Sequence, residues 1–223
     1  MRIYEAKDVM QPDHWEPVHE FEAGGEARMA VTCLAWNPSR FDTPMLLLGC
    51  TPAEGANQGA TTVRVWSFNE DHRRCGAKPH LGRPWTALAP HCPLKQLFFF
   101  CRWQMLPWSI FEGPGAPTQG IYDVDWAPNL GRKYHLLAAC SGDQQNLRIW
   151  RIPNGERFLQ AADDERVCYD ELQNTGQARR VSWNVTGTIL ASSGDDGEVK
   201  LWTMDHFRRV WSSHHSISSS AAP

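Results

Sequence analysis

A strand pattern that ends in Trp occurs three times along this 223-residue chain, and it limits the possible folds more than any other feature of the sequence. Each copy begins with a run that ends in Trp, continues with a short apolar run and a turn, and finishes with an alternating run that also ends in Trp. The copies occupy residues 31–66, 121–150 and 178–202. Alternation of apolar and polar residues is the period-2 signature of a β-strand, so each copy predicts several antiparallel strands.

The third copy shows the pattern most clearly, because its residues 187–202 read GTILASSGDDGEVKLW. Gly and Asp between two strand-like runs predict a tight hairpin turn, since Gly accepts positive φ and Asp bonds to its own backbone. After the turn, Val199 and Leu201 are expected on one face of the strand, and Lys200 and Trp202 on the other.

Repeated units of several short strands are typical of β-propellers, in which four-stranded blades pack face to face around a centre. We therefore predict an all-β chain, a partial β-propeller with about three four-stranded blades plus a stray N-terminal strand. The predicted boundaries are 1–10 for the remnant strand of a missing blade, 17–70 for the first blade, 76–152 for the second, 155–204 for the third and 205–223 for a disordered tail. With one face of the first blade and one face of the third left open, the isolated chain is expected to be sticky and of low stability.

The Trp residues of the repeat are predicted to form the packing core between blades rather than a substrate cage. The predicted structural blade core consists of Trp36, Trp66, Trp126, Trp150, Val181, Trp183, Asp196, Leu201 and Trp202, of which Asp196 is a turn residue. No catalytic, cofactor-binding or metal-binding residue is predicted. The sequence contains no phosphate-binding loop, no HExxH motif and no GxSxG elbow.

A segment around 83–115 differs in composition from the rest of the chain and lengthens the second blade. It is rich in Pro and Trp and contains the apolar run Leu-Phe-Phe-Phe-Cys at 97–101. Two interpretations stay open: a genuine insertion that leaves from a surface loop, or a retained intron in the coding sequence.

Composition excludes several classes of protein. The net charge of −3 lacks the concentrated basic face that nucleic-acid binding requires. Seven Cys, an odd number with no CxxC pair, favour reduced thiols over a disulfide framework. No signal peptide or membrane-spanning run is recognised, so the sequence predicts a soluble nuclear or cytoplasmic protein.

Four strings carry a more specific resemblance: RIYEAKDVMQPDHWEPVHEF, WNPSRFDTPM, DVDWAPNLGRKYHLLA and RRVSWNVTGTILASSGDDGEVKLW. They resemble the Seh-type nucleoporins, WD-repeat proteins of the Sec13/Seh family, over residues 1–80 and 119–204. The match corresponds to the C-terminal half of that family's propeller. The sequence departs from the WD pattern at the turn Asp, which is present as Asp196 but replaced by Ala60 and Gln144 in the other copies.

The resemblance implies an open six-bladed propeller that an α-solenoid nucleoporin completes with strands of its own. It implies a non-catalytic scaffold, without a cofactor, in the Y-shaped outer-ring complex at the nuclear envelope. It also implies membership of a coat-like complex at the vacuolar or lysosomal surface that regulates TOR signalling. The alternative is a WD-repeat substrate receptor of a ubiquitin ligase, since a propeller fold does not fix its partner.

Overall fold

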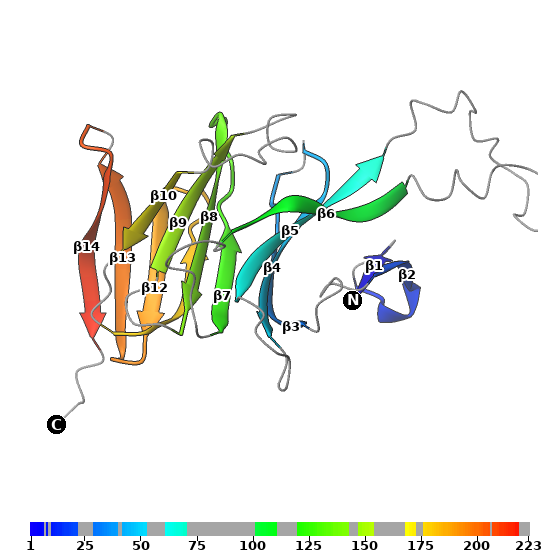
Figure 1. Cartoon of the computed structure of the whole chain (residues 1–223), viewed down its shortest axis with the longest axis horizontal. Helices are drawn as coiled ribbons and strands as arrows, with labels where there is room; N and C mark the ends of the chain where they lie inside the picture. Colours follow the sequence, from blue (N-terminus) through cyan, green and yellow to red (C-terminus); the bar gives the residue numbers. More distant parts are fainter. Residues whose placement is uncertain are drawn as a thin grey trace, which may run out of the picture. The chain divides into compact units, whose positions relative to one another are not determined.

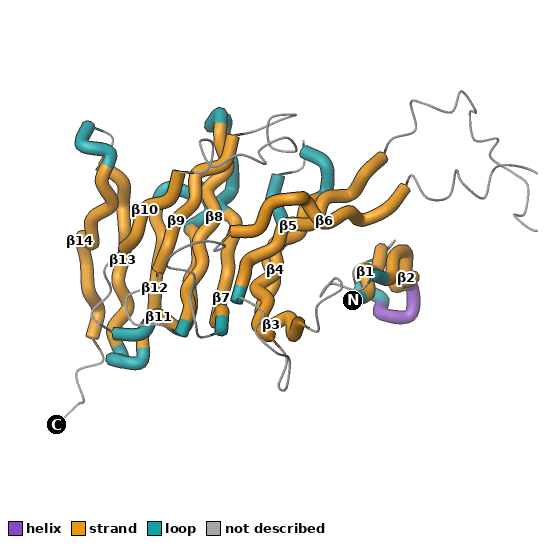
Figure 2. The backbone as a smooth tube through the Cα atoms, viewed as in Figure 1, coloured by secondary structure: helices purple, strands orange, loops and turns teal. Residues whose placement is uncertain are grey.

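The computed structural model describes residues 1–6, 8, 10–21, 29–39, 42–52, 61–70, 101–110, 120–142, 147–153, 168–172, 176–205 and 207–218. Two compact units divide the chain: residues 1–21 with 67–104, and residues 22–66 with 105–223. Strands dominate both units, and nearly every described residue outside the turns lies in an antiparallel sheet (Figures 1 and 2). The predicted all-β architecture is therefore confirmed.

The first unit contains a two-stranded hairpin, β1 (Arg2–Ala6) and β2 (Trp15–Glu20), joined through the 3-10 turn η1 (Pro12–His14). The hairpin ends are held together, because the N-terminal amine donates to the carbonyl oxygen of Phe21 at 2.7 Å. The stray strand predicted at the N-terminus thus has a partner in β2. The prediction that residues 17–20 begin the first blade is wrong, because β2 pairs with β1.

The second unit is built around three four-stranded sheets, which we call the first, second and third blades (Figure 1). The first blade has the order β3 (Met29–Trp36), β4 (Met45–Pro52), β5 (Thr62–Glu70) and β6 (Cys101–Ile110), the last two reaching into the first unit. The second has β7 (Ile121–Trp126), β8 (Tyr134–Ser141), β9 (Leu147–Pro153) and β10 (Cys168–Leu172). The third has β11 (Ala178–Trp183), β12 (Ile189–Gly194), β13 (Glu198–Asp205) and β14 (Val210–Ser218).

Three strands that the sequence assigned elsewhere close these blades, and two of them are β10 and β14. β10 lies within 155–204, predicted as the third blade, but it pairs with β9 of the second blade. β14 lies in the predicted disordered tail 205–223, yet it pairs with β13 along its whole length. Both errors have one cause: a polar edge strand carries a weak alternation signal, and backbone pairing with a neighbour is enough to order it.

The segment around 83–115 also contributes a strand. β6 occupies residues 101–110, within the range 76–152 predicted as the second blade, but it is the fourth strand of the first blade. The prediction that this segment lengthens the second blade is therefore wrong for residues 101–110. Residues 83–100 and 111–115, including most of the Phe-rich run, lie outside the described residues.

The inner strands of the three blades share one register. Trp36 of β3 faces Leu46, Trp126 of β7 faces Leu137, and Trp183 of β11 faces Leu190. The repeat seen in the sequence is therefore also a repeat in three dimensions. Because strand alternation fixes which side chains share a face, each of these Trp residues lies on the same side of its own blade.

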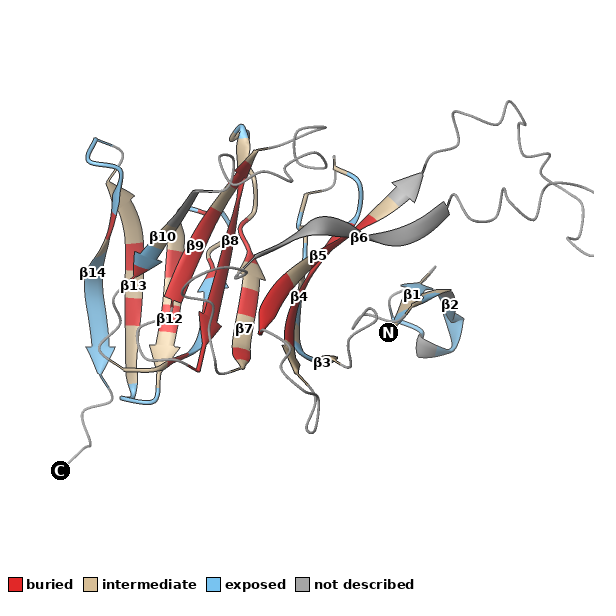
Figure 3. Cartoon of the chain, in the orientation of Figure 1, coloured by how far each residue is buried: buried red, intermediate tan, exposed pale blue. Residues whose placement is uncertain are grey.

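Two apolar cores hold the blades together, and they appear as the buried bands of Figure 3. Between the first and second blades, Trp126 and Val124 of β7 pack against Leu47 and neighbouring aliphatic residues of the first blade. Between the second and third, Trp183 and Val181 of β11 pack in the same way on the second blade. Full burial of one Trp side chain contributes roughly 4–6 kcal/mol, an upper estimate from apolar area.

Candidate protein-binding site on the third blade

Polar bonds between inner strands fix how the blades stand against one another, and thereby position the open face of the third blade. Between the first and second blades, the hydroxyl of Thr32 donates to the carbonyl oxygen of Ile121 at 2.7 Å. Between the second and third, the side-chain amide of Gln177 donates to the carbonyl oxygen of Gly142. These bonds give a partner to the carbonyl groups of Ile121, at the start of β7, and of Gly142, just after β8.

Two carboxylates on β7 form the strongest of these links. Asp125 accepts from the backbone N–H of Trp126 at 2.8 Å with one oxygen, and from the N–H of Trp183 at 2.6 Å with the other. Asp123 repeats the arrangement with the N–H groups of Val124 and Val181, both at 3.1 Å. Each carboxylate is therefore held on β7 by one hydrogen bond and joins the inner strand of the third blade through a second one.

Burial raises the pKa of Asp125, and the N–H bonds from Trp183 and Trp126 only partly oppose that effect. A carboxyl whose pKa rises on folding binds its proton more tightly in the folded state. Its contribution to stability is therefore present at low pH and is lost as pH rises from the ordinary Asp value through the raised one.

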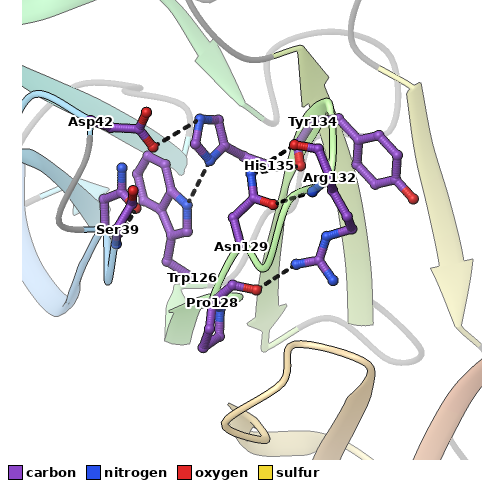
Figure 4. A network of polar contacts seen from close by, with 9 residues as sticks. Ser39, Asp42, Trp126, Pro128, Asn129, Arg132, Tyr134 and His135 are labelled. Carbon is purple, nitrogen blue, oxygen red and sulfur yellow. Dashed lines mark hydrogen bonds and ion pairs between the residues drawn. The ribbon is translucent and has the colours of Figure 1, made fainter.

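A guanidinium connects the next pair of loops, and Figure 4 shows its contact with Pro128 of its own loop. Arg132 donates from Nη1 to the carbonyl oxygen of Gly187 in the third blade and from Nη2 to that of Pro128 in its own loop, both at 2.7 Å. The loop itself is closed by Asn129, whose side-chain oxygen accepts from the Arg132 N–H at 2.7 Å. Arg132 therefore links the second blade to the β11–β12 turn.

A buried histidine faces the loop of the first blade (Figure 4). The indole N–H of Trp126 donates to Nδ1 of His135 at 3.4 Å, and Nε2 of His135 lies 3.9 Å from a carboxylate oxygen of Asp42. An indole N–H can only donate, so Nδ1 carries no proton and the ring is neutral with its proton on Nε2. Burial lowers the pKa of His135, and the attraction of Asp42 for the charged form does not reverse this.

Because His135 has a lowered pKa, we expect the free energy of unfolding to fall on mild acidification. A His whose pKa is lowered in the folded state binds fewer protons than in the unfolded chain, so stability is lost as pH falls from about 6.5 toward the folded value. Within that window the expected slope reaches about 1.4 kcal/mol per pH unit. Urea unfolding at pH 7.5 and 5.5 measures it.

A matched pair of variants isolates the effect. His135→Gln keeps an acceptor for the Trp126 indole but cannot titrate, so it should reduce the difference between the two pH values. His215→Gln removes a histidine from the exposed part of β14 and should leave the difference unchanged. An unchanged pH dependence in His135→Gln would contradict the assignment.

The outer face of the third blade is the candidate binding surface. Its β13 contributes Val199 and Leu201, both partly exposed, while Trp202 on the opposite face is buried and donates to Ser192 at 2.9 Å. Ile217 of β14 lies directly opposite Val199 and is 61% exposed. These aliphatic side chains form an apolar strip across the two strands, which we call the outer strip.

The edge of this blade is not where the sequence placed it. Leu201 lies on β13, which pairs with β12 on one side and β14 on the other, so its backbone is already paired. The strand at the edge of the sheet is β14, which the sequence analysis placed in a tail. A partner strand therefore finds backbone donors and acceptors on β14, and Leu201 contributes through its side chain alone.

The described residues give no sign of catalytic or metal chemistry. No cluster of three or more His, Cys, Asp and Glu side chains in the described ranges is placed to hold a metal ion. Burial raises the pKa of the Cys33 thiol to about 11 and that of Cys140 to about 12, so neither thiol is poised to react as a thiolate. In the same ranges, no helix has the length and hydropathy needed to cross a membrane.

Comparison with known proteins finds relatives of this strand repeat. Residues 166–203 match the family model described as "WD domain, G-beta repeat". Over 92% of its length, the chain is 31% identical to Nucleoporin SEH1 of Danio rerio, 29% to Nucleoporin SEH1-B of Xenopus laevis and 28% to Nucleoporin SEH1 of Homo sapiens. The resemblance to the Seh-type WD-repeat nucleoporins is confirmed. The chain spans about half the length of these relatives, covering 47% of the Danio rerio protein and 48% of the other two.

Most residues predicted as blade core are buried, and all of the buried ones except Trp66 belong to the two apolar cores between blades. The buried ones are Trp66, Trp126, Trp150, Val181, Trp183 and Trp202. Asp196 lies in the exposed β12–β13 turn, where its side chain accepts from the N–H of Glu198 at 3.0 Å. Leu201 belongs to the outer strip.

Trp36 departs from the prediction, because 47% of its surface is exposed. Its counterparts Trp126 and Trp183 are covered by the aliphatic face of the blade that comes before each of them, and β3 is the inner strand of the first blade.

Sequence reasoning also missed the pairs formed by Asp123 and Asp125. The sequence did carry a signal for these hydrogen bonds: two Asp residues stand at alternate positions of a strand expected to be buried. A buried Asp needs hydrogen-bond partners.

Proposed function

We propose that this chain is a non-catalytic structural scaffold of the nuclear pore complex, within its Y-shaped outer ring. The similarity to three proteins named Nucleoporin SEH1, extending over 92% of the chain, carries this proposal. A set of blades fixed by buried Trp residues and inter-blade hydrogen bonds suits a scaffold, because it presents rigid faces and edges to other proteins. The chain would then act at the nuclear envelope.

The proposed partner is an α-solenoid nucleoporin that completes the propeller with strands of its own. The outer strip and the edge of β14 support this mode of binding. Strand addition draws affinity from main-chain hydrogen bonds along an edge and specificity from side chains on the neighbouring face. The same surface would serve a coat-like complex at the vacuolar or lysosomal membrane that regulates TOR signalling.

Affinity capture of the full chain from a nuclear-envelope extract tests the complex. Recovery of the outer-ring nucleoporins, with an α-solenoid member among them, supports the proposal. Recovery of a ubiquitin-ligase adaptor in their place would overturn it in favour of a substrate-receptor role.

The direct prediction is that Leu201→Asp weakens binding of the solenoid's N-terminal segment at least tenfold. The substitution places a charge in the middle of the outer strip, and desolvating that charge at an apolar contact costs more than about 1.4 kcal/mol. Isothermal titration with the purified segment gives the dissociation constant. Val185→Asp is the matched control, because Val185 is 86% exposed in the β11–β12 turn and lies outside the strip. Equal affinity of both variants would show that the segment binds elsewhere.

A further inference from the structure

Three hairpin turns lie at one end of the second and third blades (Figure 1). In the third blade, Trp183 and Trp202 both pair with Leu190, so the β11–β12 and β13–β14 turns follow the same row of residues. The bond from Arg132 to the carbonyl oxygen of Gly187 joins the β7–β8 turn to the β11–β12 turn. We call this end, formed by residues 127–133, 184–188 and 207–209, the turn end.

Each of the three turns exposes one apolar side chain. Leu130 is 71% exposed, Val185 86% and Phe207 101%, so none of them belongs to a blade core. A single exposed apolar residue is ordinary on a protein surface. Three such tips at one end of two blades, each on its own turn, indicate a surface that meets apolar material.

The turn end is also positively charged. Its three ranges contain four basic residues and no Asp or Glu, and Lys133, Arg208 and Arg209 are exposed. The carboxylate of Asp205, just before the last range, holds the turn: one oxygen accepts from the N–H groups of Phe207 at 2.8 Å and Arg208 at 3.2 Å. Its other oxygen lies 3.9 Å from Nε of Arg208. The opposite end of the third blade, at the β12–β13 turn, carries the acidic residues Asp195, Asp196 and Glu198.

The backbone of Arg209 is strained, although this residue points into solvent. Its φ of 54° makes it the one residue other than Gly with a positive φ among those that the structure describes. The conformation closes the β13–β14 turn, because the Arg209 N–H donates to the carbonyl oxygen of Asp205 at 2.7 Å. Gly adopts such a φ without a steric penalty. An exposed cation therefore occupies a position that the backbone alone would assign to Gly, and strain of this kind is typical of functional turns.

We propose that the turn end binds the surface of a membrane that contains anionic phospholipid. The three apolar tips enter the boundary between headgroups and acyl chains, and the exposed cations beside them bind lipid phosphates. Such binding combines buried apolar area with electrostatic attraction. A protein partner would need a separate pocket for each tip, whereas a fluid lipid surface accepts tips at any spacing. This contact goes beyond the proposed scaffold role and uses neither the outer strip nor the edge of β14.

Cosedimentation of the full chain with lipid vesicles tests the proposal. We expect binding to vesicles of equal parts phosphatidylcholine and phosphatidylserine, weakened by added salt, and little binding to phosphatidylcholine alone. Phe207→Ser should weaken binding about tenfold, because it removes the largest apolar tip. Phe207→Trp should bind at least as well as the native chain, since Trp favours the membrane interface. Ile217→Ser is the matched control: Ile217 is also exposed on the third blade, but it lies beside Val199 near the acidic end.

Arg209→Gly separates membrane binding from folding. It should weaken binding to the anionic vesicles about fivefold, the contribution of one Arg near such a surface. It should also leave the free energy of unfolding unchanged or higher, because it relieves the strain at this φ. A merely structural role of Arg209 would change stability and leave vesicle binding as it was. Arg180→Gln removes an equally exposed charge from β11, outside the turn end, and should bind as the native chain does.

Three results would overturn the proposal: no binding to the anionic vesicles, Phe207→Ser binding as well as Ile217→Ser, or Arg209→Gly binding as well as Arg180→Gln. The first result would leave a protein as the partner of the turn end. The second would reduce the contact to charge alone, and the third would reduce it to apolar attraction. None of these measurements involves the solenoid, so the scaffold proposal stands or falls separately.

Discussion

Replacing Gly187 with Ala is expected to lower the free energy of unfolding by about 2–5 kcal/mol, the sum of backbone strain and overpacking. Gly187 has a φ of 63°, in the left-handed region where a Cβ atom is strained. A Cβ at this position would also collide with the carbonyl oxygen of Pro128 and lie 2.8 Å from the Arg132 guanidinium. Backbone cannot move aside as a side chain can, so the link between the second blade and the β11–β12 turn would open.

Gly131→Ala is the matched control for this prediction. Gly131 also has a positive φ, 92°, but a Cβ there meets nothing within 4 Å. Gly131→Ala should therefore lower the free energy of unfolding only by the backbone strain, about 1–2 kcal/mol. Urea unfolding followed by Trp fluorescence compares the two, and equal losses would show that close approach to Pro128 does not matter.

Asp125→Ala is expected to destabilise the chain by about 2–4 kcal/mol, because it removes two hydrogen bonds to a charged group. The loss leaves the N–H groups of Trp126 and Trp183 without this acceptor and separates the inner strands of two blades. Asp125→Asn keeps one carbonyl oxygen and should lose about half as much. Urea unfolding, with the slope of free energy against urea concentration determined for each variant, measures the free energy of unfolding of both.

Asp170→Ala serves as the comparison for Asp125. Asp170 forms an ion pair with Arg151 at 3.2 Å near the surface, within one blade. Pairs of this kind contribute about 0–1 kcal/mol. If removing Asp170 costs as much as removing Asp125, the carboxylates of β7 do not hold the blades together.

The sequence was most informative where structure is local. Alternation around Trp126, Trp150 and Trp202 predicted strands and buried faces, because the side-chain period of a strand is set by its own backbone. The hairpin turn at residues 194–197 followed from its Gly and Asp residues for the same reason, and Gly197 adopts a φ of 71° there.

The sequence was least informative at the edges of the sheets. β2, β10 and β14 carry little alternation, so their partners could be found only from the strands beside them. The joint between blades was missed as well. Asp125 and Trp183, and likewise His135 and Asp42, are far apart in the chain, and nothing in the local pattern indicates that they meet.

The amino-acid sequence by itself therefore determined the strands, the turns and the kinship with Seh-type repeats. Only the tertiary structure decided which of the equivalent Trp residues are core. Trp126 and Trp36 have the same pattern and the same register, yet one is 2% exposed and the other 47%. The physical reason is that apolar burial depends on the surface brought against a side chain, and that surface comes from another blade.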